Sequence, residues 1–175
     1  SFCMDYLAIC IAEIANISER RVEKMVNPSF SNLPAFLTPD SGLNSGLMIA
    51  QVTAASLVSE NKVLAHPASV DSIPTSTDKE DHVSMGPIAA RKLYQIIENA
   101  RFCLGIELLC ASQAIEYQRP RKSSPSLEKV MELIRKSVPS ISNDRVFYKD
   151  INFCADIIKS RKLHDCIENS LGKLQ

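Results

Sequence analysis

The stretch from Ser45 to Leu64 predicts a helix that is apolar on almost every side. Its apolar residues do not form a single stripe but surround the helix: Leu47, Met48, Ile49, Ala50, Val52, Ala54, Ala55, Leu57 and Val58. A soluble helix normally buries one face, so a helix of this kind has to lie at the centre of something large. One small domain can hardly bury it on all sides, and the pattern therefore predicts self-association of the chain.

The rest of the chain shows helical spacing and no alternating strand pattern, which predicts an all-α fold. With 175 residues, we expect a single helical domain over residues 1–175, built as a bundle of long helices. The expected helices cover residues 5–26, 45–64, 87–117, 126–138 and 150–172, with one or two helices in the last range. Three prolines after the first helix predict a loop from residue 28 to residue 43, and Pro139 ends the fourth helix.

The composition argues against nucleic acids and membranes as partners of this chain. Twenty basic side chains balance twenty acidic ones, so no strong field would attract nucleic acid or an anionic lipid surface. No uncharged run reaches the length that a membrane-spanning helix needs. The basic segment 119–125 is interpreted as a solvated linker. We therefore expect neither a nucleic acid nor a membrane as partner.

The six cysteines include no CxxC pair, and the chain carries no recognisable signal peptide. Cys3 and Cys10 are seven residues apart, and so are Cys103 and Cys110, which places each pair on one apolar helix face. Cysteine behaves as a small hydrophobic residue in a reducing compartment. We expect buried free thiols and a cytoplasmic protein.

Metal sites and the common nucleophile motifs are not indicated. The histidines (His66, His82 and His164) lie far apart, and the cysteines lack the spacing of metal ligands. The chain has no Gly-x-Ser-x-Gly turn. The turn from Gly42 to Gly46 lacks the lysine of a phosphate-binding loop, and Asn44 or Ser45 is expected to cap the next helix.

The loop over residues 65–86 collects most of the polar chemistry of the chain. Asp78, Lys79, Glu80, Asp81 and His82 follow one another there. Two interpretations stay open from the pattern alone. The carboxylates could meet the positive end of the long helix that begins at Gly86-Pro87, or one of them could contact a cationic substrate or move a proton.

Several segments resemble a known family. They are Ile17-Ser-Glu-Arg-Arg21, Ser31-Asn-Leu-Pro34, residues 42–62, residues 66–76 and Glu80-Asp-His-Val-Ser-Met85. In them the chain closely resembles the bacterial histidine ammonia-lyases, which belong to the aromatic amino acid lyases. The similarity is strong over residues 7–113 and weaker beyond residue 113. A match of this length makes the resemblance specific.

The resemblance implies a function and an assembly. Members of the family eliminate ammonia from L-histidine to give trans-urocanate in histidine degradation. Their fold is a bundle of long helices, four subunits form a homotetramer through their central helices, and each active site takes residues from three subunits. This assembly would supply the missing partners of the helix over residues 45–64.

The resemblance also assigns one site residue in this chain, Glu80. It matches the glutamate that lines the family's active site, and it implies contact with the imidazole or ammonium group of the substrate, or a part in proton transfer. Lys79 departs from the family pattern, which usually has glutamine there. A lysine beside Glu80 either lowers the pKa of that carboxyl or points outward.

The family's prosthetic group is a methylidene-imidazolone ring built from an internal Ala-Ser-Gly, which this chain does not contain. Its Ala-Ser pairs continue with Leu57, Val70 and Gln113, whereas ring closure relies on the tight approach that glycine allows. The resemblance therefore implies the C-terminal part of a lyase, inactive by itself. The alternatives are a non-catalytic helical assembly module, a subunit of a split lyase, or a lyase for another aromatic amino acid.

Overall fold

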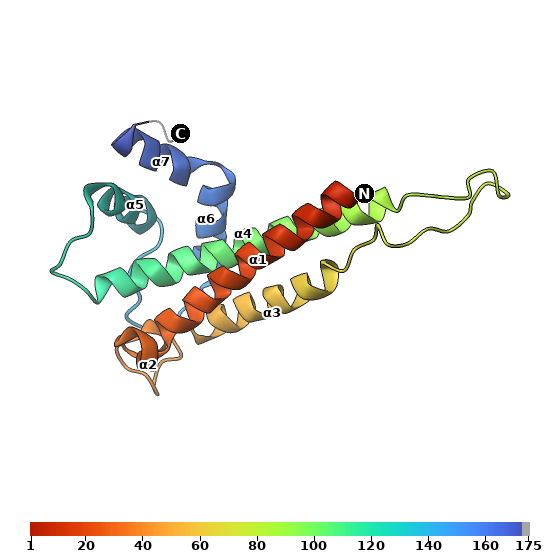
Figure 1. Cartoon of the computed structure of the whole chain (residues 1–175). Coiled ribbons are helices and arrows are strands. Elements are labelled where there is room, and N and C mark those ends of the chain that lie inside the picture. Colours follow the sequence, from red (N-terminus) through yellow and green to blue (C-terminus); the bar gives the residue numbers. More distant parts are fainter. Residues whose placement is uncertain (173–175) are drawn as a thin grey trace.

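The computed structural model describes residues 1–172, and the regular elements in that range are all helices (Figure 1). Its elements are α1 (Phe2–Val26), α2 (Pro28–Ser31), the 3-10 helix η1 (Ala35–Leu37), α3 (Met48–Leu64), α4 (Gly86–Glu116), α5 (Pro125–Arg135), α6 (Tyr148–Lys159) and α7 (Lys162–Leu171). The described residues form only isolated β-bridges and no strand, which confirms the all-α class. None of these helices is both long and apolar enough to span a membrane.

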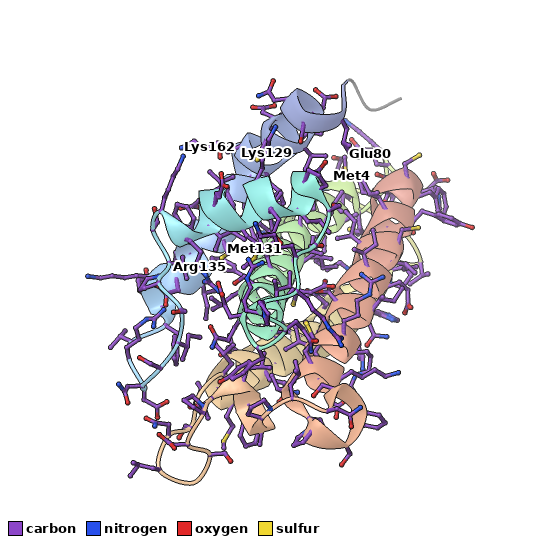
Figure 2. The ribbon with its side chains drawn as sticks, turned by 90° about the vertical axis from the view of Figure 1, so that its left-hand side faces the viewer. Met4, Glu80, Lys129, Met131, Arg135 and Lys162 are labelled. Carbon is purple, nitrogen blue, oxygen red and sulfur yellow. The ribbon has the colours of Figure 1, made fainter. Side chains whose placement is uncertain are left out.

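The long helix α4 lies at the centre of the molecule. It packs against α1 and α3 on one side and against α6 on the other, while α5 and α7 pack together next to α6. Figure 2, turned by 90° from Figure 1, shows α1 on one side, α5 and α7 on the other, and α4 between them. The polar loop that the sequence analysis placed at residues 65–86 connects α3 to α4 and extends away from the packed helices (Figure 1).

Helix α3 buries only part of its apolar surface within this chain. Ala50, Ala54 and Val58 face α1 and α4 and are at most 5% exposed. On its other sides Ile49 and Val52 are more than half exposed, at 63% and 53%. The small buried residues let the neighbouring helices approach closely, and the exposed branched residues leave an apolar face on the surface.

Charged side chains on the apolar stripe of α4 are paired with neighbouring helices. The guanidinium of Arg101 lies 2.6 Å from the carboxylate of Glu98 and 3.2 Å from that of Asp156 on α6. Hydrogen bonds from Arg101 are the main reason why the pKa of Glu98 lies below its ordinary value. Arg21 of α1 approaches Glu107 at 3.3 Å. These pairs tie α4 to α6 and to α1.

The helix expected from Ser45 begins at Met48, and the cap expected from Asn44 or Ser45 is wrong. The N–H groups of Ser45 and Gly46 donate to the carboxylate of Asp144, at 2.7 and 2.8 Å, and not to a capping side chain of Asn44 or Ser45. Asn44 accepts from the N–H of Asp144 at 3.1 Å. Gly46 also has φ +53, and a Cβ there would lie 2.5 Å from the carbonyl oxygen of Phe36, so glycine is required.

Helix α1 begins at Phe2 rather than at residue 5, α6 begins at Tyr148 rather than at residue 150, and other bounds also differ from the expectation. The loop over residues 28–43 contains α2 and η1, because Asn27 caps α2 by accepting from Ser29 N–H at 3.1 Å. Helix α5 ends at Arg135 rather than at residue 138, since the residue before a proline disfavours helix. The range 150–172 divides into α6 and α7 at Arg161, whose φ of +63 is left-handed.

The six thiols are free, and only part of the expected burial is found. Cys103, Cys110 and Cys154 are buried, and desolvation raises the pKa of Cys103 and of Cys154 to about 12. Cys3 and Cys10 are exposed, so burial was wrong for that pair. They do share one face of α1 as the spacing required, but the described residues leave that face uncovered.

Gly105 marks the closest approach of α4 to α6. A Cβ placed on it would lie 2.9 Å from the backbone nitrogen of Ala155 and 3.1 Å from its Cα. Both atoms belong to the backbone of a packed helix and cannot move aside as a side chain does. Glycine at this position therefore sets the distance between the two helices.

We expect Gly105→Ala to lower the free energy of unfolding by about 1–2 kcal/mol, because overpacking strains the crossing of α4 and α6. Helix propensity alone gives the opposite sign, a gain of about 1 kcal/mol. Urea denaturation followed by circular dichroism measures the change. Adding Ala155→Gly should restore only part of the loss, since two of the three contacts are to backbone atoms. A stabilised Gly105→Ala variant would contradict the close crossing.

Candidate functional site

The polar segment between α3 and α4 forms a long protrusion, which we call the arm (residues 65–85). In Figure 1 it extends from the ends of α3 and α4 beyond the helices and turns back on itself at its tip. Residues 73–82 are all exposed. The arm therefore presents its side chains away from the rest of this chain.

Glu80 lies at the tip of the arm and is held there by Thr75. The two residues form an antiparallel bridge, with the N–H of Thr75 donating to the carbonyl of Glu80 at 3.0 Å and the reverse bond at 3.3 Å. The Thr75 hydroxyl also donates to Glu80 Oε2 at 3.2 Å. The carboxylate on which the sequence analysis settled is thus held by both backbone and side-chain contacts.

The turn between these two residues has a strained backbone. Ser76, Thr77 and Asp78 have φ values of +56, +54 and +63, a left-handed conformation that residues other than glycine rarely adopt. Such residues cost of order 1 kcal/mol each and are often found at functional sites, where the surrounding structure maintains them. Lys79, next to Glu80, is exposed in the same turn.

The structure brings Glu80 together with Thr75 but not with the start of α4. Glu80 lies five residues before Met85, the N-cap of α4, whereas a helix dipole acts mainly within the first turn of the helix. The first turn of α4 contains no acidic residue. The contacts of Glu80 are therefore with Thr75 rather than with the first turn of α4.

The base of the arm is tied to α1 and α4. The backbone N–H of Ser69 donates to Oδ2 of Asp5 on α1 at 2.7 Å, and Lys92 of α4 donates to the carbonyl of His66. Farther out, the N–H of Val83 donates to the Ser72 hydroxyl at 2.9 Å and links the two sides of the arm. These bonds join the base of the arm to α1 and α4 and its two sides to each other.

Asp5 and Thr75 were not among the site residues predicted from the sequence. A signal for Asp5 was present, since it is an isolated acid in the apolar run that opens α1 and is only 3% exposed. Thr75 offered no signal of its own, because its pairing with Glu80 depends on the conformation of the turn.

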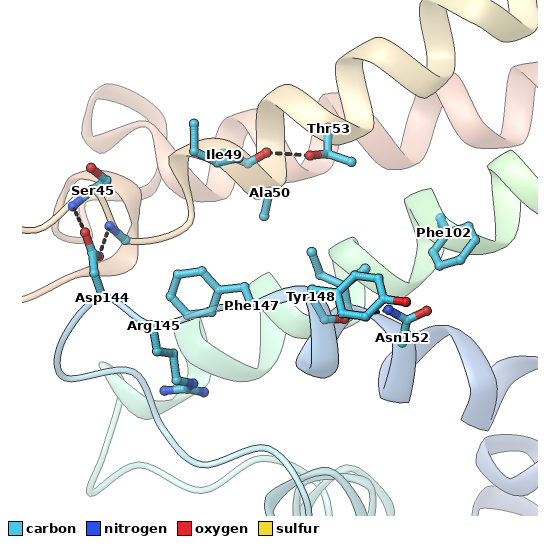
Figure 3. Close-up of a pocket in the computed structure, with 12 residues that line it drawn as sticks. Ser45, Ile49, Ala50, Thr53, Phe102, Asp144, Arg145, Phe147, Tyr148 and Asn152 are labelled. Carbon is cyan, nitrogen blue, oxygen red and sulfur yellow. Dashed lines mark hydrogen bonds between the residues drawn. The ribbon is translucent and has the colours of Figure 1, made fainter.

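A separate cavity of about 540 Å³ lies between α3, α4 and the start of α6 (Figure 3). Ile49, Phe102, Phe147 and Ile151 make its walls largely apolar, and Asp144 at one end already accepts two backbone N–H groups. No residue of the arm lines it. Two of its other polar side chains are also engaged, since Arg145 pairs with Asp150 at 2.8 Å and Asn152 donates to the carbonyl of Tyr148 at 2.7 Å.

Metal binding and ring formation find no suitable residues in the described part of the chain. Residues 1–172 contain no group of three or more histidine, cysteine, aspartate or glutamate side chains that could hold a metal ion. Two of the three Ala-Ser pairs, at Ala55 and Ala111, lie inside α3 and α4. The third is followed by Val70, and its Ser69 N–H is bound to Asp5. These residues do not fit the formation of a methylidene-imidazolone ring.

Comparison with known proteins gives a consistent result. Residues 1–136 match the family model of the aromatic amino acid lyases. A histidine ammonia-lyase from a Geobacillus species is 57% identical over 159 residues, which cover 91% of this chain and 31% of that protein. The chain thus spans about a third of the length of this relative.

Solved structures show the same similarity. The crystal structure of histidine ammonia-lyase from Trypanosoma cruzi has a TM-score of 0.92 and 48% identity, over 95% of this chain and 33% of that one. A tyrosine aminomutase from Streptomyces globisporus has a TM-score of 0.93 at 33% identity, over 99% of this chain and 33% of that one. Fold similarity is thus shared by both structures, and sequence identity is higher for the histidine enzyme.

Proposed function

This chain belongs to the aromatic amino acid lyase family, and on that premise we propose that it forms the C-terminal part of a histidine ammonia-lyase. Such an enzyme eliminates ammonia from L-histidine to give trans-urocanate. The observation that carries the proposal is the 57% identity to the Geobacillus enzyme over almost the whole chain. Identity is 48% to the solved histidine enzyme and 33% to the tyrosine aminomutase, which favours histidine over tyrosine as substrate.

Glu80 is the residue to which we assign a role at the substrate. It is exposed at the tip of the arm, where its carboxylate can accept a hydrogen bond from the imidazole or the ammonium group of L-histidine. The same carboxylate can accept or return a proton during the elimination. This chain contains no Ala-Ser-Gly from which the electrophilic ring of the family could form. Substrate binding and proton transfer by Glu80 are therefore the only chemical roles that we assign to this chain.

The partners proposed for the chain are L-histidine and further copies of itself, as a homotetramer in the cytoplasm. Helix α1 supports self-association, since Phe2 and Tyr6 are 76% exposed and Ile14 and Ile17 are about half exposed, at 52% and 50%. Exposed apolar side chains gathered on one element mark an interaction surface. An arm that presents Glu80 away from its own chain agrees with an active site shared between subunits.

A graft tests the activity. We expect no urocanate from this chain alone with L-histidine, and urocanate formation when residues 1–175 replace the matching part of the Geobacillus enzyme. The reason is that this chain lacks Ala-Ser-Gly. Absorbance of urocanate measures both reactions. The unaltered Geobacillus enzyme is the positive control. Turnover by the isolated chain, or a folded but inactive graft, would argue against the proposal.

In the active graft, Glu80→Gln should lower kcat by about 10²-fold or more, which is the usual contribution of a positioned acid or base. The amide keeps the shape of the side chain and removes its ability to take a proton. Asp81→Asn is the matched control, an exposed carboxylate one residue away, and should leave kcat nearly unchanged. Equal kinetics for the two variants would remove Glu80 from the site.

Sedimentation velocity tests self-association of the isolated chain. We expect oligomers, and we expect Ile14→Glu to shift them towards monomer, because a charge on the exposed apolar face of α1 would have to be desolvated in an interface. Gln118→Glu adds the same charge at an exposed position outside that face and serves as control. A chain that sediments as a monomer at all concentrations would contradict this prediction.

A further inference from the structure

Asp5 is a buried carboxylate that the proposed roles of Glu80 do not use. It lies in the first turns of α1, is only 3% exposed, and accepts the backbone N–H of Ser69 at 2.7 Å across a sequence separation of 64 residues. Burying a carboxylate is unfavourable unless hydrogen bonds compensate for the lost water. Oδ2 has such a bond, to the N–H of Ser69, whereas Oδ1 is buried and makes no hydrogen bond within the described residues.

The surroundings of Asp5 favour its charged form. Burial raises the pKa of this carboxyl, but hydrogen bonds from Ser69 and Ala68, together with the charge of Lys92, outweigh it and hold the pKa below its ordinary value. A hydrogen bond to a charged acceptor is shorter and stronger than one between neutral groups. The contact between Asp5 and Ser69 is therefore a charge-assisted hydrogen bond that ties α1 to the arm.

The position of this tie matters because of the length of the arm. Six residues lead from Ser69 to Thr75, and an extended chain spans at most about 3.3 Å per residue, so the tip lies up to about 20 Å beyond the anchor. A tilt of about 10° at the anchor displaces the tip by up to about 3.5 Å. Catalysis can lose about 10²-fold in rate from a misplacement of about 1 Å.

We propose that Asp5 is a positioning residue, which aims the arm through Ser69 and so places Glu80 at the substrate. This role rests on the proposed function, although the anchoring of the arm by Asp5 is a property of this chain alone. Lys92 also holds the base of the arm, by donating a hydrogen bond to the backbone carbonyl of His66. Thr75 then holds Glu80 at the tip, where its hydroxyl lies 3.2 Å from Oε2.

The first experiment tests the anchor in the isolated chain. Amide hydrogen exchange at Ser69 should become about 10- to 100-fold faster in Asp5→Ala, the loss expected for a hydrogen bond to a charged acceptor. Nitrogen relaxation should report lower order parameters for residues 70–83. Asp5→Asn keeps an acceptor oxygen and should lie between Asp5→Ala and the unaltered chain. Glu13→Gln, an exposed carboxylate on the same helix, is the control. Unchanged exchange and order in both Asp5 variants would overturn the proposal.

The second experiment tests whether Asp5 acts through Glu80, in the active graft. Asp5→Ala should lower kcat for L-histidine about 10- to 100-fold, with Asp5→Asn partly active. In the Glu80→Gln background, Asp5→Ala should cause no further loss, because the group that it positions is already gone. Losses that multiply in the double variant would overturn the positioning role. If Asp5→Ala does not fold, the same cycle with Asp5→Asn decides the question.

A failure of the proposed function has a different signature. In that case Glu80→Gln would leave kcat unchanged, while the exchange at Ser69 would still respond to Asp5. If instead Glu80→Gln lowers kcat and Asp5 affects neither exchange nor rate, the proposed function stands and the role of Asp5 falls.

Discussion

The packing of α4 against α1, α3 and α6 is the constraint on which the rest of this structure depends. Gly105 lets α6 approach on one side, and small residues such as Ala54 let α3 approach on the other. With α4 fixed, its N-terminus and the end of α3 fix the two ends of the arm. The place of Glu80 is therefore set by packing that occurs far from it.

The arm is a long, polar and exposed loop, yet hydrogen bonds hold both its base and its tip. Exposed loops of this length usually fluctuate unless they have a function. Here Asp5 and Lys92 hold the base, and Thr75 holds the carboxylate at the tip. The left-handed residues of the turn add strain that such ties have to maintain. An arm anchored in this way is suited to placing one carboxylate at a site built mainly by other parts of an enzyme.

The predictions from sequence succeeded where one residue pattern decides the outcome, and failed where distant residues compete. Helical spacing and the Asn27-Pro28 boundary ended α1 at Val26 as expected. The start of α3 was wrong because Asp144, about a hundred residues away, takes the backbone N–H groups of Ser45 and Gly46. Two helices in the last range were among the expected outcomes, but no glycine or proline marked the position of the break at Arg161. Cys3 and Cys10 follow the spacing of a buried face, yet the described residues leave them exposed.

The sequence by itself determined the all-α class, the apolar helix that a single chain cannot cover, the resemblance to the lyases and the choice of Glu80, because each depends on local periodicity or on a contiguous motif. Only the tertiary structure decided the direction of the arm, the pairing of Thr75 with Glu80 and the anchor at Asp5. The anchor joins residues that are distant in the chain. The pairing of Thr75 with Glu80 needs a left-handed turn, which a glycine would normally indicate in the sequence. The anchor and the direction of the arm depend on how the helices pack, and the pairing of Thr75 with Glu80 depends on the left-handed turn between them.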